Sequence, residues 1–370
     1  MDNRPVTQNI MQPKPSTALN WALILALGKR LMSCLLLFST LFVTSCKQNM
    51  VEPPPIPPTR GINPNIVQVE DHYDSTHKIL GTYRMGVWSK NKIYTVTPLR
   101  EITLDLNLNI VHDTILALFG RYRFVSVNKA GSKLLLVRSL SSDLSVGGLF
   151  EFNLQSGTIR LLKDSSFFIS SALFMNNDEQ CMYYSYGNAA QSFSAGYYLR
   201  NVTTAQESLL VPHLSDVSYF EVANGFDLSP DNSKLLMPLH YSSAAPSIME
   251  YDLVSGSAET LQVSFTHQFI WLRYNGVGSK ILYSNYSWGS GGHSVADLSE
   301  IGIIDRGTLS KEVLNVNTNT SVLIGYGSIN LFPNWSPDFK HIVYGSTRGP
   351  YFEPPGSISD YSLYVLKNVY

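Results

Sequence analysis

Cysteine is scarce in this chain of 370 residues, which limits how the folded part is stabilised. The three cysteines are Cys34, Cys46 and Cys181. The first two lie in an N-terminal segment with a separate role, argued below, so Cys181 stands alone and a disulfide within the folded part is excluded. Residues 182–184 are apolar or aromatic, which predicts that Cys181 is a buried small side chain. The folded part must therefore be stabilised by its core alone.

Charge is also sparse. Only 15% of the residues are charged and the net charge is −1, so the chain has no positive field that would gather nucleic acid. Aromatic residues, at 12%, are abundant by comparison. Beyond the N-terminal region, no segment of about ten residues shows the 3.6-residue periodicity of an amphipathic helix. These observations predict an all-β domain whose partners are not nucleic acids.

Common catalytic motifs are missing. The chain has no Gly-x-Ser-x-Gly elbow and no His-Glu-x-x-His, and Gly276–Lys280 lacks the ending of a phosphate loop, so it is interpreted as a hairpin turn. A metal site would require His240, His267 and His293 to converge from separate loops. The sequence therefore predicts no catalytic residue, no metal site and no cofactor.

The beginning of the chain carries an export signal. Lys29 and Arg30 precede an apolar run over 31–42, and the small residues 43–45 lead into Cys46. The run is too short for about 30 Å of hydrocarbon, which needs roughly 20 residues. This order resembles the lipobox of bacterial lipoproteins, which implies that Cys46 is acylated and becomes the first mature residue. The alternative is a single-pass membrane anchor.

Three segments follow from this interpretation. Residues 1–45 are the signal peptide, of which 1–28 are either an extended leading region or the product of an upstream start. Residues 46–64 hold the lipidated cysteine and a linker with Pro53–Pro55 and Pro57–Pro58, which favours an extended polyproline spacer. Residues 65–370 form the folded domain.

One pattern recurs six times in the folded domain. Each copy has a short strand, a turn, a lysine or its equivalent, and an apolar strand, and the clearest copies are 226–238 and 334–346. The recurring position is occupied by Lys92, Lys133, Gln180, Lys234, Lys280 and Lys340, spaced roughly 40 to 60 residues apart. In the clearest copies, Ser-Pro-Asp supplies the turn, because proline presets φ and aspartate tolerates the remaining conformations. Two further strands follow each copy, as in 148–154 and 158–162.

Trp335-Ser336-Pro337-Asp338, with the apolar strand 342–344, resembles the repeats of TolB-like (WD40-like) six-bladed β-propellers. The resemblance implies six four-stranded antiparallel blades, although neither Ser-Pro-Asp copy has the family's usual glycine after the aspartate. The last unit stops after its third strand at Tyr370, so residues 65–70 are expected to supply the fourth and close the ring. An eight-stranded sandwich with a small second domain is the alternative, but it leaves the sixfold recurrence unexplained.

The blade geometry predicts one face rich in long loops. Loops between second and third strands emerge at the same end of the ring as the connections between blades, and binding residues concentrate on such loops. Exposed aromatic and polar side chains there suit a sugar ring or a peptide. The candidates for ligand binding are Tyr186, His240, Tyr241, Trp288, His293, Arg348 and Tyr351.

The sequence therefore favours a lipid-anchored binding or scaffold module in the bacterial envelope, facing the periplasm or held at the outer membrane, with a protein or glycan as partner. TolB-like proteins imply protein partners by resemblance. The alternative is a glycoside hydrolase or lyase with its site at the mouth of the propeller channel, using loop carboxylates such as Asp216, Asp297 and Glu353. Two titratable side chains that converge within about 10 Å at the channel would favour the enzyme. A purely structural protein would instead bury its loop aromatics.

Overall fold

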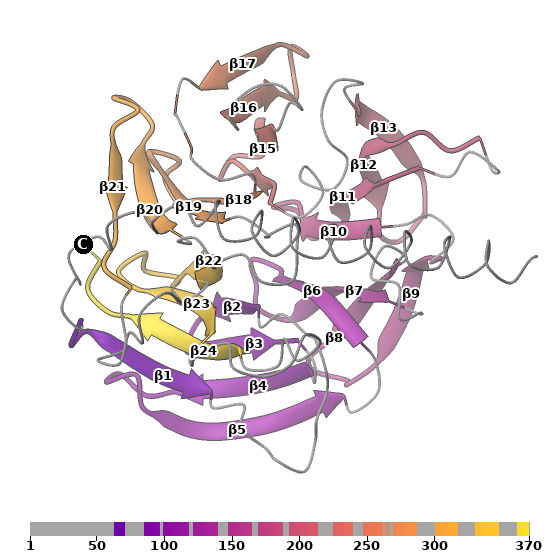
Figure 1. Cartoon of the computed structure of the whole chain (residues 1–370). Helices are drawn as coiled ribbons and strands as arrows, with labels where there is room; N and C mark the ends of the chain where they lie inside the picture. The colour runs from indigo at the N-terminus through magenta and orange to yellow at the C-terminus, as the bar shows by residue number, and fades with distance from the viewer. Residues whose placement is uncertain are drawn as a thin grey trace, which may run out of the picture. The chain divides into compact units, whose positions relative to one another are not determined.

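The protein is a six-bladed β-propeller in the computed structural model (Figure 1). The structure describes residues 63–70, 85–96, 99–117, 121–139, 147–164, 169–187, 192–213, 225–239, 247–261, 263, 265, 269–286, 300–316, 330–347 and 361–369. All of these residues are in strands, turns and short irregular connections, with no helix among them. Six sheets of four antiparallel strands form the blades, which confirms the predicted fold class.

The strands of each blade follow one another from the centre of the ring outward. The first strands are β2 (Gly86–Ser89), β6 (Arg121–Val127), β10 (Ile169–Phe174), β14 (Asp227–Leu228), β18 (Phe269–Tyr274) and β22 (Asn330–Trp335). The second strands are β3 (Lys92–Thr95), β7 (Lys133–Ser139), β11 (Gln180–Ser185), β15 (Lys234–Leu239), β19 (Lys280–Tyr286) and β23 (Ile342–Thr347). The third strands are β4 (Leu99–Leu104), β8 (Gly147–Asn153), β12 (Gly196–Asn201), β16 (Ser247–Asp252), β20 (Glu300–Asp305) and β24 (Tyr361–Leu366). The outer strands are β5 (Ile110–Ala117), β9 (Ile159–Lys163), β13 (Glu207–Pro212), β17 (Ala258–Leu261), β21 (Lys311–Val313) and β1 (Ile66–Glu70).

The N-terminal strand closes the ring, as the sequence predicts. β1 pairs antiparallel with β24, and Val67 lies opposite Val365. The backbone N–H of Lys367 donates to the carbonyl of Asn65 at 2.9 Å, which extends the pairing by one step. The last blade is thus built from both ends of the domain, so separating either end opens a sheet.

Each predicted copy of the repeat is the pair of first and second strands in one blade. The recurring lysine has a structural reason, because it reaches a glutamate on the third strand. Lys92 contacts Glu101 at 2.6 Å, Lys133 contacts Glu151 at 3.2 Å and Lys234 contacts Glu250 at 3.0 Å. Such diagonal neighbours on one face of a sheet are within reach of long side chains.

The turns show one misalignment in the sequence interpretation. Ser229 Oγ accepts the backbone N–H of Lys234, and Ser336 Oγ accepts that of His341, both at 2.9 Å. The equivalent of Lys234 in the last copy is therefore His341, one residue after the predicted Lys340. The serine and this position are five residues apart in both copies, and Lys340 misleads the alignment because it supplies the expected residue type one position earlier.

The glycine missing after the aspartate also has an explanation. Asn232 and Phe339 adopt left-handed conformations, with φ of 59° and 60°, a region that favours glycine. Asparagine tolerates this region, whereas phenylalanine is strained there. Phe339 packs against Trp335, with ring centroids 6.3 Å apart, and this packing offsets the strain.

Candidate functional site

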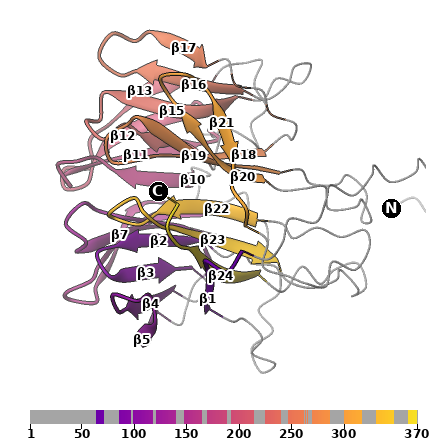
Figure 2. The ribbon, with the colours of Figure 1, turned by 90° about the vertical axis from the view of Figure 1, so that its left-hand side faces the viewer.

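The two ends of the ring differ. The turns between first and second strands and between third and fourth strands emerge at one end, here named the turn face; it includes 89–92, 128–133 and 153–159. The connections between second and third strands, and those between blades, emerge at the other end, named the long-loop face. In Figure 2 the strands of all six blades run between these two ends.

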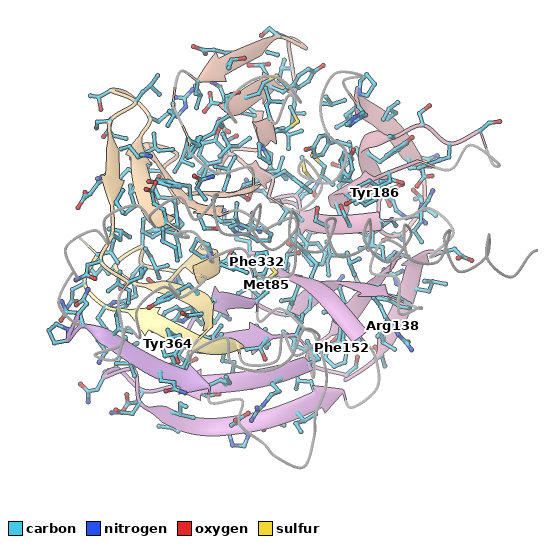
Figure 3. All side chains as sticks on the ribbon, viewed as in Figure 1. Met85, Arg138, Phe152, Tyr186, Phe332 and Tyr364 are labelled. Carbon is cyan, nitrogen blue, oxygen red and sulfur yellow. The ribbon has the colours of Figure 1, made fainter. Side chains whose placement is uncertain are left out.

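Of the seven predicted binding residues, the structure describes one, Tyr186, which lies on the long-loop face. Tyr186 follows β11 and is partly buried, and its ring meets Tyr184 edge-on with centroids 5.5 Å apart (Figure 3). Tyr184 in turn shares a hydrogen bond of 3.0 Å between its hydroxyl and His213 Nδ1. The other candidates, His240, Tyr241, Trp288, His293, Arg348 and Tyr351, lie outside the described residues. Their roles remain predictions.

Phe193 shows what becomes of one loop aromatic. Its ring stacks on Tyr198 with centroids 4.4 Å apart, and Lys163 Nζ lies 4.4 Å from the Phe193 centroid. Lys163 also pairs with Glu207 of the neighbouring blade. Phe193 therefore packs between the second and third blades. It has the structural role that a loop aromatic can have in place of ligand binding.

Aromatic side chains close the central channel. Trp271 of β18 lies with its ring centroid 5.9 Å from Phe124 of β6 and 4.9 Å from Phe332 of β22. The blades that contain β18 and β6 stand opposite each other in a six-membered ring, so the first contact crosses its axis. Figure 3 places Phe332 and Met85 at the centre of the ring. Trp271 and Met85 are each only 2% exposed, so the channel is filled at this level.

A belt of polar contacts joins four blades on the turn-face side of Trp271. Arg273 donates from Nη1 to the carbonyl of Phe226 at 2.7 Å and from Nε to Asn334 Oδ1 at 2.9 Å. Asn334 donates from Nδ2 to the carbonyl of Gly86 at 2.8 Å. The guanidinium also lies 4.1 Å from the Trp271 ring centroid. The belt thus satisfies buried groups while tying blades together.

Asp227 and Arg273 are the titratable groups that converge beside the channel. Burial raises the pKa of Asp227 to about 6, although Arg273 and the N–H of Tyr274, 2.7 Å from Oδ2, oppose that rise. Burial also lowers the pKa of Arg273 to about 10. Two titratable side chains therefore do come together beside the channel, as an enzyme would require. However, hydrogen bonds within the fold already engage both Asp227 and Arg273.

Sequence reasoning missed this pair because neither residue lies in a long loop or a motif. A signal was present in 269–274, where one arginine interrupts an otherwise apolar and aromatic strand. Buried arginine in such a strand requires partners, and those partners come from other blades. Nothing in the linear sequence identifies them.

The turn aspartates are structural. Asp231 accepts hydrogen bonds from the Ser229 and Ser233 hydroxyls at 2.6 and 2.8 Å, which lower its pKa to about 2. Asp338 accepts from Ser336 Oγ at 2.6 Å in the same way. Both carboxylates are therefore committed to their own turns, as predicted.

The part of the chain that the structure describes also lacks two features. It contains no cluster of three or more histidine, cysteine, aspartate or glutamate side chains placed to hold a metal ion. No helix of sufficient length and hydropathy to cross a membrane occurs within it.

Solved structures resemble this fold at low sequence identity. The putative TolB from Agrobacterium tumefaciens superposes with a TM-score of 0.50 at 14% identity, over 77% of this chain and 90% of that chain. TolB from Acinetobacter baumannii gives 0.48 at 14% identity, over 77% of this chain and 64% of that chain. Oligogalacturonate lyase from Vibrio parahaemolyticus gives 0.48 at 12% identity, over 78% of each chain. No protein-family model and no curated protein matches the sequence.

The class of the protein is therefore a six-bladed β-propeller with four-stranded blades and an N-terminal closing strand. In fold it is TolB-like, and at these identities the likeness concerns the fold alone. This fold is compatible with a binding or scaffold module.

Proposed function

We propose that this protein is a lipid-anchored, non-enzymatic binding module of the bacterial envelope that holds a protein or glycan on its long-loop face. One observation carries the proposal: Trp271, Phe124 and Phe332 fill the channel, and the charged groups beside them are engaged within the fold. A ligand would then rely on the long loops, whose sequences contain His240, Trp288 and Tyr351 among other aromatic and histidine residues. The partly buried Tyr186 and the Tyr184–His213 pair supply a rigid border for that surface.

Binding through the long-loop face can be tested by capturing partners with the full chain. The double variant Trp288→Ala/Tyr351→Ala is expected to lose most of the protein recovered from envelope extract, or most of the signal on a glycan array, because truncated aromatic anchors typically cost over 1 kcal/mol each. The matched control is Val254→Ala/Val277→Ala, which shortens two exposed apolar side chains, 88% and 79% accessible, on the turn face. Equal recovery by all three proteins would refute the loop-face proposal.

The lipid anchor can be tested separately. Cys46→Ser is expected to move the protein from the membrane fraction to the soluble fraction and to abolish incorporation of a labelled fatty acid, because serine lacks the thiol that is acylated. Cys34→Ser is the matched control, since it lies within the same signal and should leave both readouts unchanged. Labelling that persists in Cys46→Ser would contradict the assignment of the first mature residue.

The loop carboxylates of the alternative enzyme, Asp216, Asp297 and Glu353, lie outside the described residues. Within the described residues, Asp227 and Arg273 form a titratable pair beside the channel. The hydrogen bonds of both groups within the fold argue for a structural role. If the wild type cleaves a polysaccharide and Asp227→Asn does not, the pair is catalytic and this conclusion is wrong.

A further inference from the structure

A small pocket opens on the turn face between the first and second blades. It has a volume of about 290 Å³, at the lower end of the range for ligand pockets, and ten residues line it. They come from the first turn and the strands β3 and β4 of blade one, and from two turns of blade two. Among them are Ser89, Lys90, Lys92, Glu101, Gly131 and Gln155.

The wall of this pocket is an ion pair. Lys92 Nζ lies 2.6 Å from Glu101 Oε1, and the Glu101 side chain is only 14% exposed. Tyr94 is buried, and burial together with the neighbouring Glu101 raises the pKa of its hydroxyl. The one carboxylate in the lining is thus engaged, while two lysines give the pocket an excess of positive charge.

Lys90 is the unusual residue at the rim. It adopts a left-handed conformation with φ of 54°, at a turn position occupied in the other blades by Gly131, Asp178, Asn232, Gly278 and Phe339. Phe339 packs against Trp335, but Lys90 is exposed, and among the described residues its side chain has no hydrogen-bond or ion-pair partner. Trp88 Nε1 donates to the Lys90 carbonyl at 3.1 Å and fixes the backbone. A strained, unpartnered lysine at a pocket rim is a feature that indicates function.

Gly131 keeps the pocket open. A Cβ at this position would lie 2.6 Å from Ser89 Oγ, so any side chain would intrude between the two turns. Ser89 and Gln155 line the same space as Lys90. The pocket thus combines a positive group with short hydroxyl and amide groups that can donate and accept.

From this arrangement we infer a second binding site, on the turn face, for a single sugar unit that carries a carboxylate. Lys90 pairs with the carboxylate, and Ser89 and Gln155 bind ring hydroxyls. The volume admits one ring and no longer oligomer. The site lies at the opposite end of the blades from the long-loop face. A failure of the proposed function would therefore not contradict this site, and a failure of this site would not contradict the proposed function.

D-glucuronate is the probe for this site, with D-glucose and acetate as comparison ligands, in saturation-transfer-difference titrations of the full chain. Glucuronate is expected to bind at least about tenfold more tightly than either comparison ligand, because only it offers both the charge and the hydroxyls. Acetate binding as well as glucuronate, or no glucuronate binding, would overturn the inference.

Variants separate this role from a structural one. Lys90→Gly should weaken glucuronate about tenfold or more while melting no lower than the wild type, because glycine relieves the left-handed strain. Gly131→Ala should also lose binding. Its matched control is Gly157→Ala in the same blade, which has φ of 67° against 68° and no atom within 4 Å of the added Cβ. Retained binding in Lys90→Gly, or equal loss in both alanine variants, would refute the site.

Discussion

Replacing Glu250 with alanine is expected to destabilise the protein by about 3 kcal/mol. The Glu250 side chain is 2% exposed and joins two blades. Its Oε2 accepts from Lys234 at 3.0 Å and from Arg306 Nη2 at 2.6 Å, and its Oε1 accepts from the Tyr274 hydroxyl at 2.7 Å. Arg306 and Tyr274 belong to the next blade, so the variant leaves cations and a buried hydroxyl without an acceptor. Urea unfolding measures the loss.

Glu259→Ala is the control for this prediction. Glu259 lies directly across the strand pair from Glu250 but is exposed, so its removal should change stability by less than about 0.5 kcal/mol. Equal effects of the two substitutions would show that the contacts of Glu250 between blades contribute nothing particular.

The same group predicts a pH dependence. Burial alone would raise the pKa of Glu250, but hydrogen bonds from Arg306, Tyr274 and Lys234 lower it to about 2 from an ordinary 4.5. A depressed pKa in the folded state means that the stabilisation is complete above pH 4.5 and disappears as the pH falls towards 2. The stability difference between the wild type and Glu250→Gln should therefore shrink across that window. A difference that stays constant down to pH 2 would contradict this assignment.

Trp271→Ala is expected to destabilise the protein by about 3 to 5 kcal/mol, because it empties the centre of the ring. Trp271 contacts Phe124 across the axis and Phe332 beside it, and its Nε1 donates to the carbonyl of Pro333 at 3.2 Å. Arg273 also rests on its ring.

Trp271→Phe distinguishes filling of the channel from the single hydrogen bond. Phenylalanine keeps an aromatic ring at the axis but cannot donate to Pro333, so about 1 kcal/mol should be lost. Thermal unfolding of both variants, compared with the wild type, measures the difference. Equal losses would mean that the hydrogen bond, and not the aromatic contact across the ring, stabilises the centre.

The repeat shows how far sequence reasoning extended. The turn chemistry of Ser229 and Asp231 and the alternation in the second strands are local, because each depends on residues within one blade. The recurring pattern identified all six strand pairs, and the missing fourth strand of the last unit pointed to the closing strand. The error of one residue at Lys340 arose because a lysine precedes the equivalent position, and the hydrogen bond to Ser336 Oγ confirms that this position is His341.

The candidate sites were likewise predictable from the sequence only in part. Loop length and residue type predicted where Tyr186 emerges, but not that Tyr184 and His213 would support it. The pocket beside Lys90 left no trace in the sequence, since its lining comes from turns and strands of two blades, and their separation depends on how the blades pack.

By itself the sequence determined the export signal as a prediction, and the all-β repeat and its closure as features that the structure confirms. These are encoded by short-range order: charge before an apolar run, proline at a turn, and apolar alternation along a strand. Only the tertiary structure decided that Trp271 meets Phe124 and that Arg273 reaches Phe226 and Asn334. Those contacts join residues from different blades, and closing the ring is what brings them together.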